Sequence, residues 1–312
     1  MRLSVFSLLV ATALVAQQEP AFKSGATTVA VYATVTDSAG RLVPDLTKDD
    51  FEIFDNGKKQ PIALFESGQQ PITVVMMLDR SGSMRSNFNL VRSAAEQFVT
   101  RLLPGDKARI GSFADRIQVD PRAFTSSQRE MIEILRTQLQ EAGATPLWNA
   151  INVGITGLLH QDGRRVVLVF TDGMDRPMNE SSNNVSLKDA MKRAQQEDVM
   201  VYAIGLAGQN GFGGRGRRGY GAMGGRMRIP PPEADKPDPG LMKIATETGG
   251  GYFELTSAND LNGTFTRVAD ELHRQYALGF VPEKLDGKTH KLELRLRDRL
   301  LAARTRKSYI AK

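Results

Sequence analysis

The sequence feature that most constrains the fold is the run ITVVMML at residues 72–78, which ends directly at Asp79. A strand that is apolar at successive positions has to be covered on both faces, as in the interior of a parallel sheet. Two more strands of this kind are expected, RRVVLVF from Arg164 and VMVYAIGL at residues 199–206. The chain should therefore contain a sheet with helices packed against both faces.

Segments with apolar residues at helical spacing separate these strands. The first runs from Leu90 to Leu103 and stops at Pro104-Gly105, a pair that ends helices. Further helices are expected at residues 127–141, 146–160, 187–197, 240–248 and 258–275, and short strands at 107–115, 116–124 and 251–255. This alternation predicts an α/β fold with a doubly wound, mostly parallel sheet and helices on both faces.

The two ends of the chain have a β pattern instead. Residues 27–67 alternate between apolar and polar side chains, and Asn56-Gly57 between two such runs is a strong hairpin signal. Because this segment has few strands, we expect the C-terminal strands to complete it as one β-sandwich-like module. The predicted organisation is a signal peptide at 1–18, an N-terminal β-module at 19–70, an α/β domain at 71–275, and completing strands at 276–312.

The N-terminus predicts export. One positive charge at Arg2 precedes an apolar run from Leu3 to Ala16, and polar residues follow, which is the layout of a cleaved secretory signal. We therefore expect a secreted or periplasmic protein. The chain has no cysteine, which excludes disulfides, thiol catalysis and thiolate zinc sites.

Most of the formal net charge of +6 comes from one glycine-rich segment at residues 208–229. It has no acidic residue and contains five arginines: Arg215, Arg217, Arg218, Arg226 and Arg228. Its composition predicts a mobile loop, because it has too few apolar side chains to offset the entropy cost of ordering. One hypothesis is a cationic lip that attracts an acidic partner. A tolerated insertion is the plain alternative, and because the protein is expected to be exported we expect no nucleic acid partner.

Oxygen-bearing side chains follow the apolar strands where the strands end. Asp79 ends the first strand and Ser81 and Ser83 come directly after it, while Asp172 follows the strand from Arg164. Thr145 opens an expected helix. Because functional groups gather beyond the carboxyl ends of parallel strands, we expect these five to converge. An all-oxygen set suits a hard divalent cation such as Mg²⁺, with Mn²⁺ or Ca²⁺ as alternatives.

The motif DRSGS from Asp79, the threonine of GATPLWNA and the aspartate of VFTDG resemble the metal-ion-dependent adhesion site of von Willebrand factor type A domains. The resemblance implies that Ser81, Ser83 and Thr145 bind the metal directly, and that Asp79 and Asp172 act mainly through water. It also implies that the carboxylate of a protein partner completes the coordination of the metal. The flanking β segments resemble those of secreted bacterial proteins of acidobacterial type.

The sequence therefore predicts a secreted, metal-dependent protein-binding module. The alternatives are a structural envelope or matrix component with an incidental metal, and a metal-dependent hydrolase. We expect no enzymatic activity, because His160, His273 and His290 do not suggest a triad with a serine and an acid.

Overall fold

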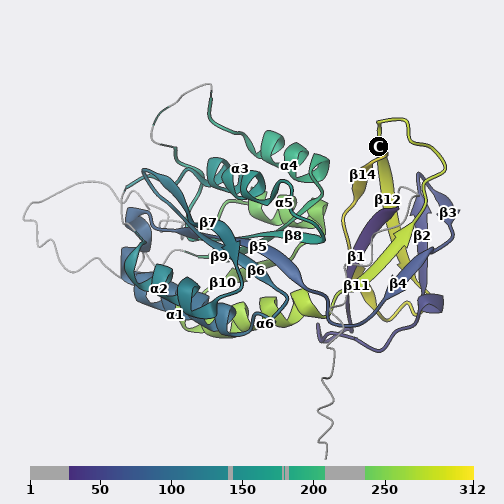
Figure 1. Cartoon of the computed structure of the whole chain (residues 1–312), viewed down its shortest axis with the longest axis horizontal. Helices are drawn as coiled ribbons and strands as arrows, with labels where there is room; N and C mark the ends of the chain where they lie inside the picture. Colours follow the sequence, from purple (N-terminus) through teal and green to yellow (C-terminus); the bar gives the residue numbers. More distant parts are fainter. Residues whose placement is uncertain (1–27, 140–142, 178, 180–182, 208–235) are drawn as a thin grey trace, which may run out of the picture.

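The computed structural model describes residues 28–139, 143–177, 179, 183–207 and 236–312. An α/β part and a smaller β part lie side by side (Figure 1). None of the helices in the described ranges is long and apolar enough to cross a membrane. The predicted signal peptide, residues 1–18, lies outside the described residues.

The α/β part is built on a sheet in the order β10-β9-β8-β5-β6-β7. Its strands are β5 (Ile72–Asp79), β6 (Lys107–Phe113), β7 (Ile117–Thr125), β8 (Arg164–Thr171), β9 (Val199–Leu206) and β10 (Tyr252–Leu255). Only β7 runs antiparallel to its neighbour in this sheet. The apolar strand β5 is buried along its whole length, between β8 and β6. The expected doubly wound, mostly parallel sheet is confirmed.

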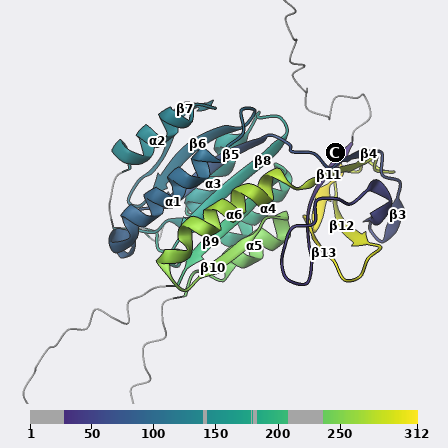
Figure 2. The ribbon, with the colours of Figure 1, turned by 90° about the horizontal axis from the view of Figure 1, so that it is seen from below.

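Helices cover both faces of this sheet. They are α1 (Phe88–Thr100), α2 (Gln128–Thr137) and α6 (Leu261–His273) on one face, and α3 (Leu147–Leu158), α4 (Leu187–Gln196) and α5 (Gly240–Thr248) on the other (Figures 1 and 2). Successive residues of β5 pack into the hydrophobic cores on opposite faces of the sheet. Val74 and Met76 pack with α1 and α6, whereas Val75 and Met77 pack with α3 and α5. Both faces of β5 are therefore apolar because both are buried.

The β part consists of two four-stranded sheets, β13-β1-β11-β4 and β14-β12-β2-β3. The N-terminal strands are β1 (Val29–Thr36), β2 (Phe51–Asp55), β3 (Lys58–Gln60) and β4 (Leu64–Glu66); the C-terminal ones are β11 (Tyr276–Phe280), β12 (Thr289–Leu296), β13 (Ala302–Arg304) and β14 (Ser308–Ile310). Strand β1 pairs with β11, and β2 pairs with β12. The C-terminal strands thus complete the N-terminal ones, as expected, while the exact limits at residues 71 and 275 stay a prediction.

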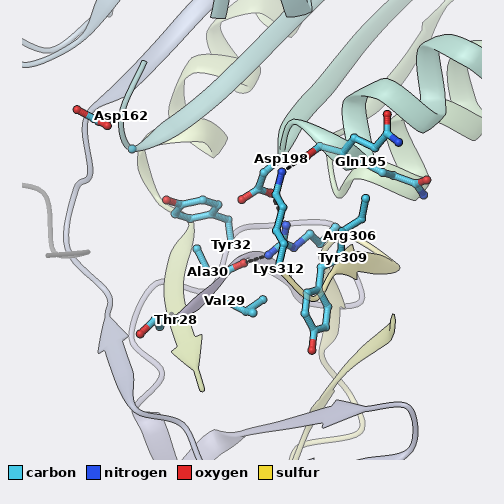
Figure 3. A pocket seen from close by; sticks show the side chains of 13 residues that line it. Thr28, Val29, Ala30, Tyr32, Asp162, Gln195, Asp198, Arg306, Tyr309 and Lys312 are labelled. Atoms are coloured by element: carbon cyan, nitrogen blue, oxygen red, sulfur yellow. Dashed lines mark hydrogen bonds and ion pairs between the residues drawn. The ribbon is translucent and has the colours of Figure 1, made fainter. Parts of the chain in front are cut away.

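Side chains from both parts meet at the seam between them. Arg306 donates to the Ala30 carbonyl and to Asp198, and Lys312 Nζ donates to the Gln196 carbonyl at 3.0 Å. A pocket of about 360 Å³ opens beside these contacts (Figure 3). Asp198 directly precedes β9, so this pocket lies at the amino ends of the parallel strands, opposite the edge where Asp79 lies.

The buried carboxylate of Asp106 fixes the start of β5. Its oxygens accept the backbone N–H groups of Ile72 at 2.8 Å and Leu103 at 2.7 Å. The Nε2 atom of His273, at the end of α6, lies 2.6 Å from Asp106 Oδ2. One side chain thus holds together the first residue of β5, the turn before β6 and the last turn of α6.

Replacing this carboxylate should destabilise the whole fold. We expect Asp106→Ala to lower the free energy of unfolding by about 3 kcal/mol, because it leaves buried donors without an acceptor. Urea denaturation measures the change. The control Gly263→Ala lies in α6, where an added Cβ meets open space, and should stabilise by about 0.5–1 kcal/mol. Equal stabilities for Asp106→Ala and wild type would contradict the assigned role.

Candidate metal centre

The carboxyl ends of β5 and β8 bring the predicted acidic residues to one edge of the sheet. Asp79, the last residue of β5, is fully buried. Its Oδ1 accepts the backbone N–H of Ser81 at 2.8 Å, and its Oδ2 accepts the hydroxyl of Thr171 at 2.5 Å. The carboxylate therefore holds both the turn after β5 and the end of β8.

A hydrogen-bonded chain continues from this carboxylate to the second aspartate. The hydroxyl oxygens of Ser81 and Ser83 lie 3.1 Å apart, and Ser83 donates to Asp172 Oδ1 at 2.9 Å. Ser81 and Asp172 are buried, whereas Ser83, in the short 3-10 helix η2 (Gly82–Asn87), is exposed. Four of the five predicted residues thus form one polar cluster that reaches the surface at Ser83.

The fifth predicted residue, Thr145, lies just before α3. Its backbone exchanges two hydrogen bonds with Arg176, of 2.9 and 2.8 Å. A Cβ atom built on Gly173 would lie 3.9 Å from Thr145 Oγ1, so this hydroxyl is next to the residue that follows Asp172. The structure therefore brings all five predicted side chains to one edge of the sheet.

The electrostatics of this edge favour a positive charge. The pKa of Asp79 is raised to about 6: burial is the main cause and the nearby charge of Asp172 adds to it, while hydrogen bonds from Ser81 and Thr171 act in the opposite direction. A bound cation would relieve this penalty on the charged carboxylates. Within the described ranges no three His, Cys, Asp or Glu side chains cluster for a metal, and the donors at this edge are two carboxylates with three hydroxyls. That donor set fits a hard divalent cation.

Two further residues, Thr171 and Arg80, stabilise this edge of the sheet. They are not among the five residues predicted from the sequence. The buried Thr171 hydroxyl donates to Asp79 and accepts the backbone N–H of Gly173 at 3.1 Å. The Arg80 guanidinium stacks on the Phe88 ring, 3.9 Å from its centroid, and therefore fixes the turn after β5 against α1. A hydroxyl at the last position of β8, directly before Asp172, is the signal that could have identified Thr171.

Other predicted groups lie elsewhere. The segment with Arg215, Arg217, Arg218, Arg226 and Arg228 lies outside the described residues, so its role stays a prediction. Two of the histidines are buried against carboxylates: His273 contacts Asp106 and His290 Nδ1 lies 2.8 Å from Asp55. Both contacts are made away from the Asp79 edge, at the start of β5 and within the β part.

A comparison with protein-family models matches the von Willebrand factor type A domain over residues 73–267, more than half of the chain. The chain belongs to this family. Von Willebrand factor type A domains typically serve as protein-interaction or adhesion modules, which is the coarse function that the match supports. No curated protein matches the chain.

One solved structure shows the same fold. A von Willebrand factor type A protein from Catenulispora acidiphila is 13% identical, with a TM-score of 0.51 over 93% of this chain and 74% of that one. That coverage extends beyond the family match and includes most of the β part. Proximal thread matrix protein 1 from the mussel byssus is 18% identical, with a TM-score of 0.46 over 69% of this chain. This chain spans about half of that protein, 49% of its length. BatB from Bacteroides thetaiotaomicron is 18% identical, with a TM-score of 0.45 over 64% of this chain and 98% of that one.

Removing the Thr171 hydroxyl should loosen the edge. We expect Thr171→Val to lower the free energy of unfolding by about 1–3 kcal/mol, because it leaves a buried carboxylate oxygen and the Gly173 N–H without this partner. Thr156→Val is the matched control, since the Thr156 hydroxyl is exposed and bonds only within α3, and it should change stability by less than about 0.5 kcal/mol. Chemical denaturation measures the free energy of unfolding of both variants. Equal losses for Thr171→Val and Thr156→Val would refute the anchoring role of Thr171.

Proposed function

We propose that this protein is a secreted, metal-dependent protein-binding module that captures a carboxylate of its partner through a divalent cation. The observation that carries the proposal is the hydrogen-bonded chain from Asp79 through Ser81 and Ser83 to Asp172 at one edge of the sheet. These are the residue types that the family's adhesion site would use, in one place.

In the proposed site the three hydroxyls and the two carboxylates have different tasks. Ser81, Ser83 and Thr145 would bind the cation directly, while Asp79 and Asp172 would orient the serines and accept hydrogen bonds from metal-bound water. Magnesium commonly keeps several waters, which suits a site with few direct protein ligands. Because hydroxyls are neutral, a cation held in this way supplies a positive charge that is only partly balanced.

The burial pattern supports an outward-facing site. Asp79 and Ser81 are almost inaccessible, while Ser83 is exposed. The negative charge of buried Asp79 therefore stabilises a cation from the protein side. The exposed Ser83 lies on the solvent side, from which a partner can approach. A partner carboxylate arriving there would complete the coordination and balance the charge.

The proposed location is outside the cytoplasm, either secreted or periplasmic. It rests on the signal-like pattern of residues 1–18. An interaction module with its site on the surface is suited to contact between proteins at the cell envelope.

Metal titration tests the site itself. We expect wild type to bind one Mg²⁺, and Ser83→Ala to bind it at least about tenfold more weakly, because a direct ligand and the bond to Asp172 are both lost. Ser86→Ala, an exposed serine in the same short helix, should bind as wild type does. Isothermal titration calorimetry of the three proteins gives the affinities. Saturable Mg²⁺ binding that is identical in all three would place the metal elsewhere.

Capture of partners tests the function. Immobilised wild type should retain proteins from an envelope fraction in the presence of Mg²⁺ and release them when a chelator is added. Ser83→Ala should retain far less, while Ser86→Ala should behave as wild type does. Proteins that are retained equally with chelator and by Ser83→Ala would favour a structural component with an incidental metal.

A further inference from the structure

The loop after β8 is tied down on both sides of Met174. Before it, Asp172 accepts the Ser83 hydroxyl at 2.9 Å. After it, the half-buried Asp175 accepts the backbone N–H of Trp148, in the first turn of α3, at 3.3 Å. The two backbone hydrogen bonds between Arg176 and Thr145 close the loop. This segment is therefore held both to η2, which follows β5, and to the start of α3.

Two side chains of this tethered loop point outward instead of inward. Met174 is 46% exposed and Arg176 is exposed, whereas Asp175 between them is half-buried. Exposing a large apolar side chain beside a charged site has no benefit for folding. On a tethered backbone, however, little conformational entropy is lost when a partner binds. Methionine is also suited to contact with varied apolar side chains.

Other exposed apolar side chains of the α/β part lie at the same edge. In the described ranges six large apolar side chains are strongly exposed: Leu90, Met174, Met242, Val281, Leu285 and Leu300. Leu90 and Met242 lie in the first turns of α1 and α5, which begin at the carboxyl edge of the sheet, as does the loop of Met174. The last three belong to loops of the β part. The edge with the proposed metal site therefore also offers apolar contact area.

We propose that Met174 and Arg176 determine which carboxylate is captured. The partner segment carries an apolar residue that packs on Met174 and a second acidic residue that pairs with Arg176, both within a few positions of the metal-binding carboxylate. An arginine guanidinium holds a carboxylate through two parallel hydrogen bonds, which makes this pairing selective. This inference rests on the proposed function, because the captured carboxylate places the partner beside the loop.

A peptide library provides a defined probe. Seven-residue peptides with aspartate fixed at the centre are displayed on phage and selected on the immobilised protein, with Mg²⁺ or with chelator. We expect Mg²⁺-dependent recovery, with apolar and acidic residues beside the central aspartate enriched about tenfold over serine and glycine. Met174→Ser should lose the apolar preference alone, and Arg176→Gln the acidic preference alone.

Matched controls separate contact from general effects. Leu285→Ser removes a side chain that is 57% exposed in the β part, and Arg299→Gln removes an exposed arginine there. Both should select the same peptides as wild type. Met174→Leu should restore the apolar preference, and Met174→Ser should unfold at the wild-type midpoint, which shows that its changed selection comes from the surface.

The outcomes distinguish the two proposals. Mg²⁺-dependent recovery with random flanking residues, or with the wild-type preferences kept in Met174→Ser and Arg176→Gln, overturns the inference and leaves the proposed function standing. Recovery that does not depend on Mg²⁺, or selected peptides that bind equally well when their central aspartate is replaced by asparagine, overturns both.

Discussion

The parallel pairing of β5 with β6 and β8 is the constraint on which the rest of the molecule depends. Asp79 is in register with Phe113 of β6, and Leu78 with Phe170 of β8, so neighbours on both sides fix the end of the strand. The apolar residues of β5 fill the two cores of the α/β part, and its last residue begins the polar edge. Packing and site geometry are therefore set by the same strand, and neither can shift alone.

Burial sets the charge properties of Asp79 at this edge. Asp79 lies at the end of an apolar strand, where the loss of solvent disfavours its charged form, and hydrogen bonds from Ser81 and Thr171 only partly offset this. Asp172, directly after the neighbouring strand β8, adds a second negative charge. Serine and threonine bring oxygen ligands to this edge without further charge. The edge thus combines uncompensated negative charge with an exposed serine, a combination that suits a cation and, through that cation, an anion of a partner.

The sequence predicted the elements of the α/β part and the convergence of the five polar residues, because both follow from local pattern and strand polarity. The pairing of C-terminal with N-terminal strands was predictable from open edges. The contact between Asp106 and His273 joins residues 167 positions apart and has no local pattern. The bridge from Thr145 to Arg176 likewise depends on how two loops pack, so the exposure of Met174 was visible only in three dimensions.

The strands that flank the α/β part have a modular consequence. Strand β4 precedes it, β11 follows it, and these two strands pair with each other in one sheet. The chain therefore leaves the β part and returns to it at neighbouring points, about 5 Å apart at the strand spacing. In this respect the α/β part is an insertion in a β host. The strands of this host come from two separate stretches of the sequence but pack together as one unit. Such a host can carry any insert whose two ends lie close together, so recognition can diverge while the platform that presents it is retained.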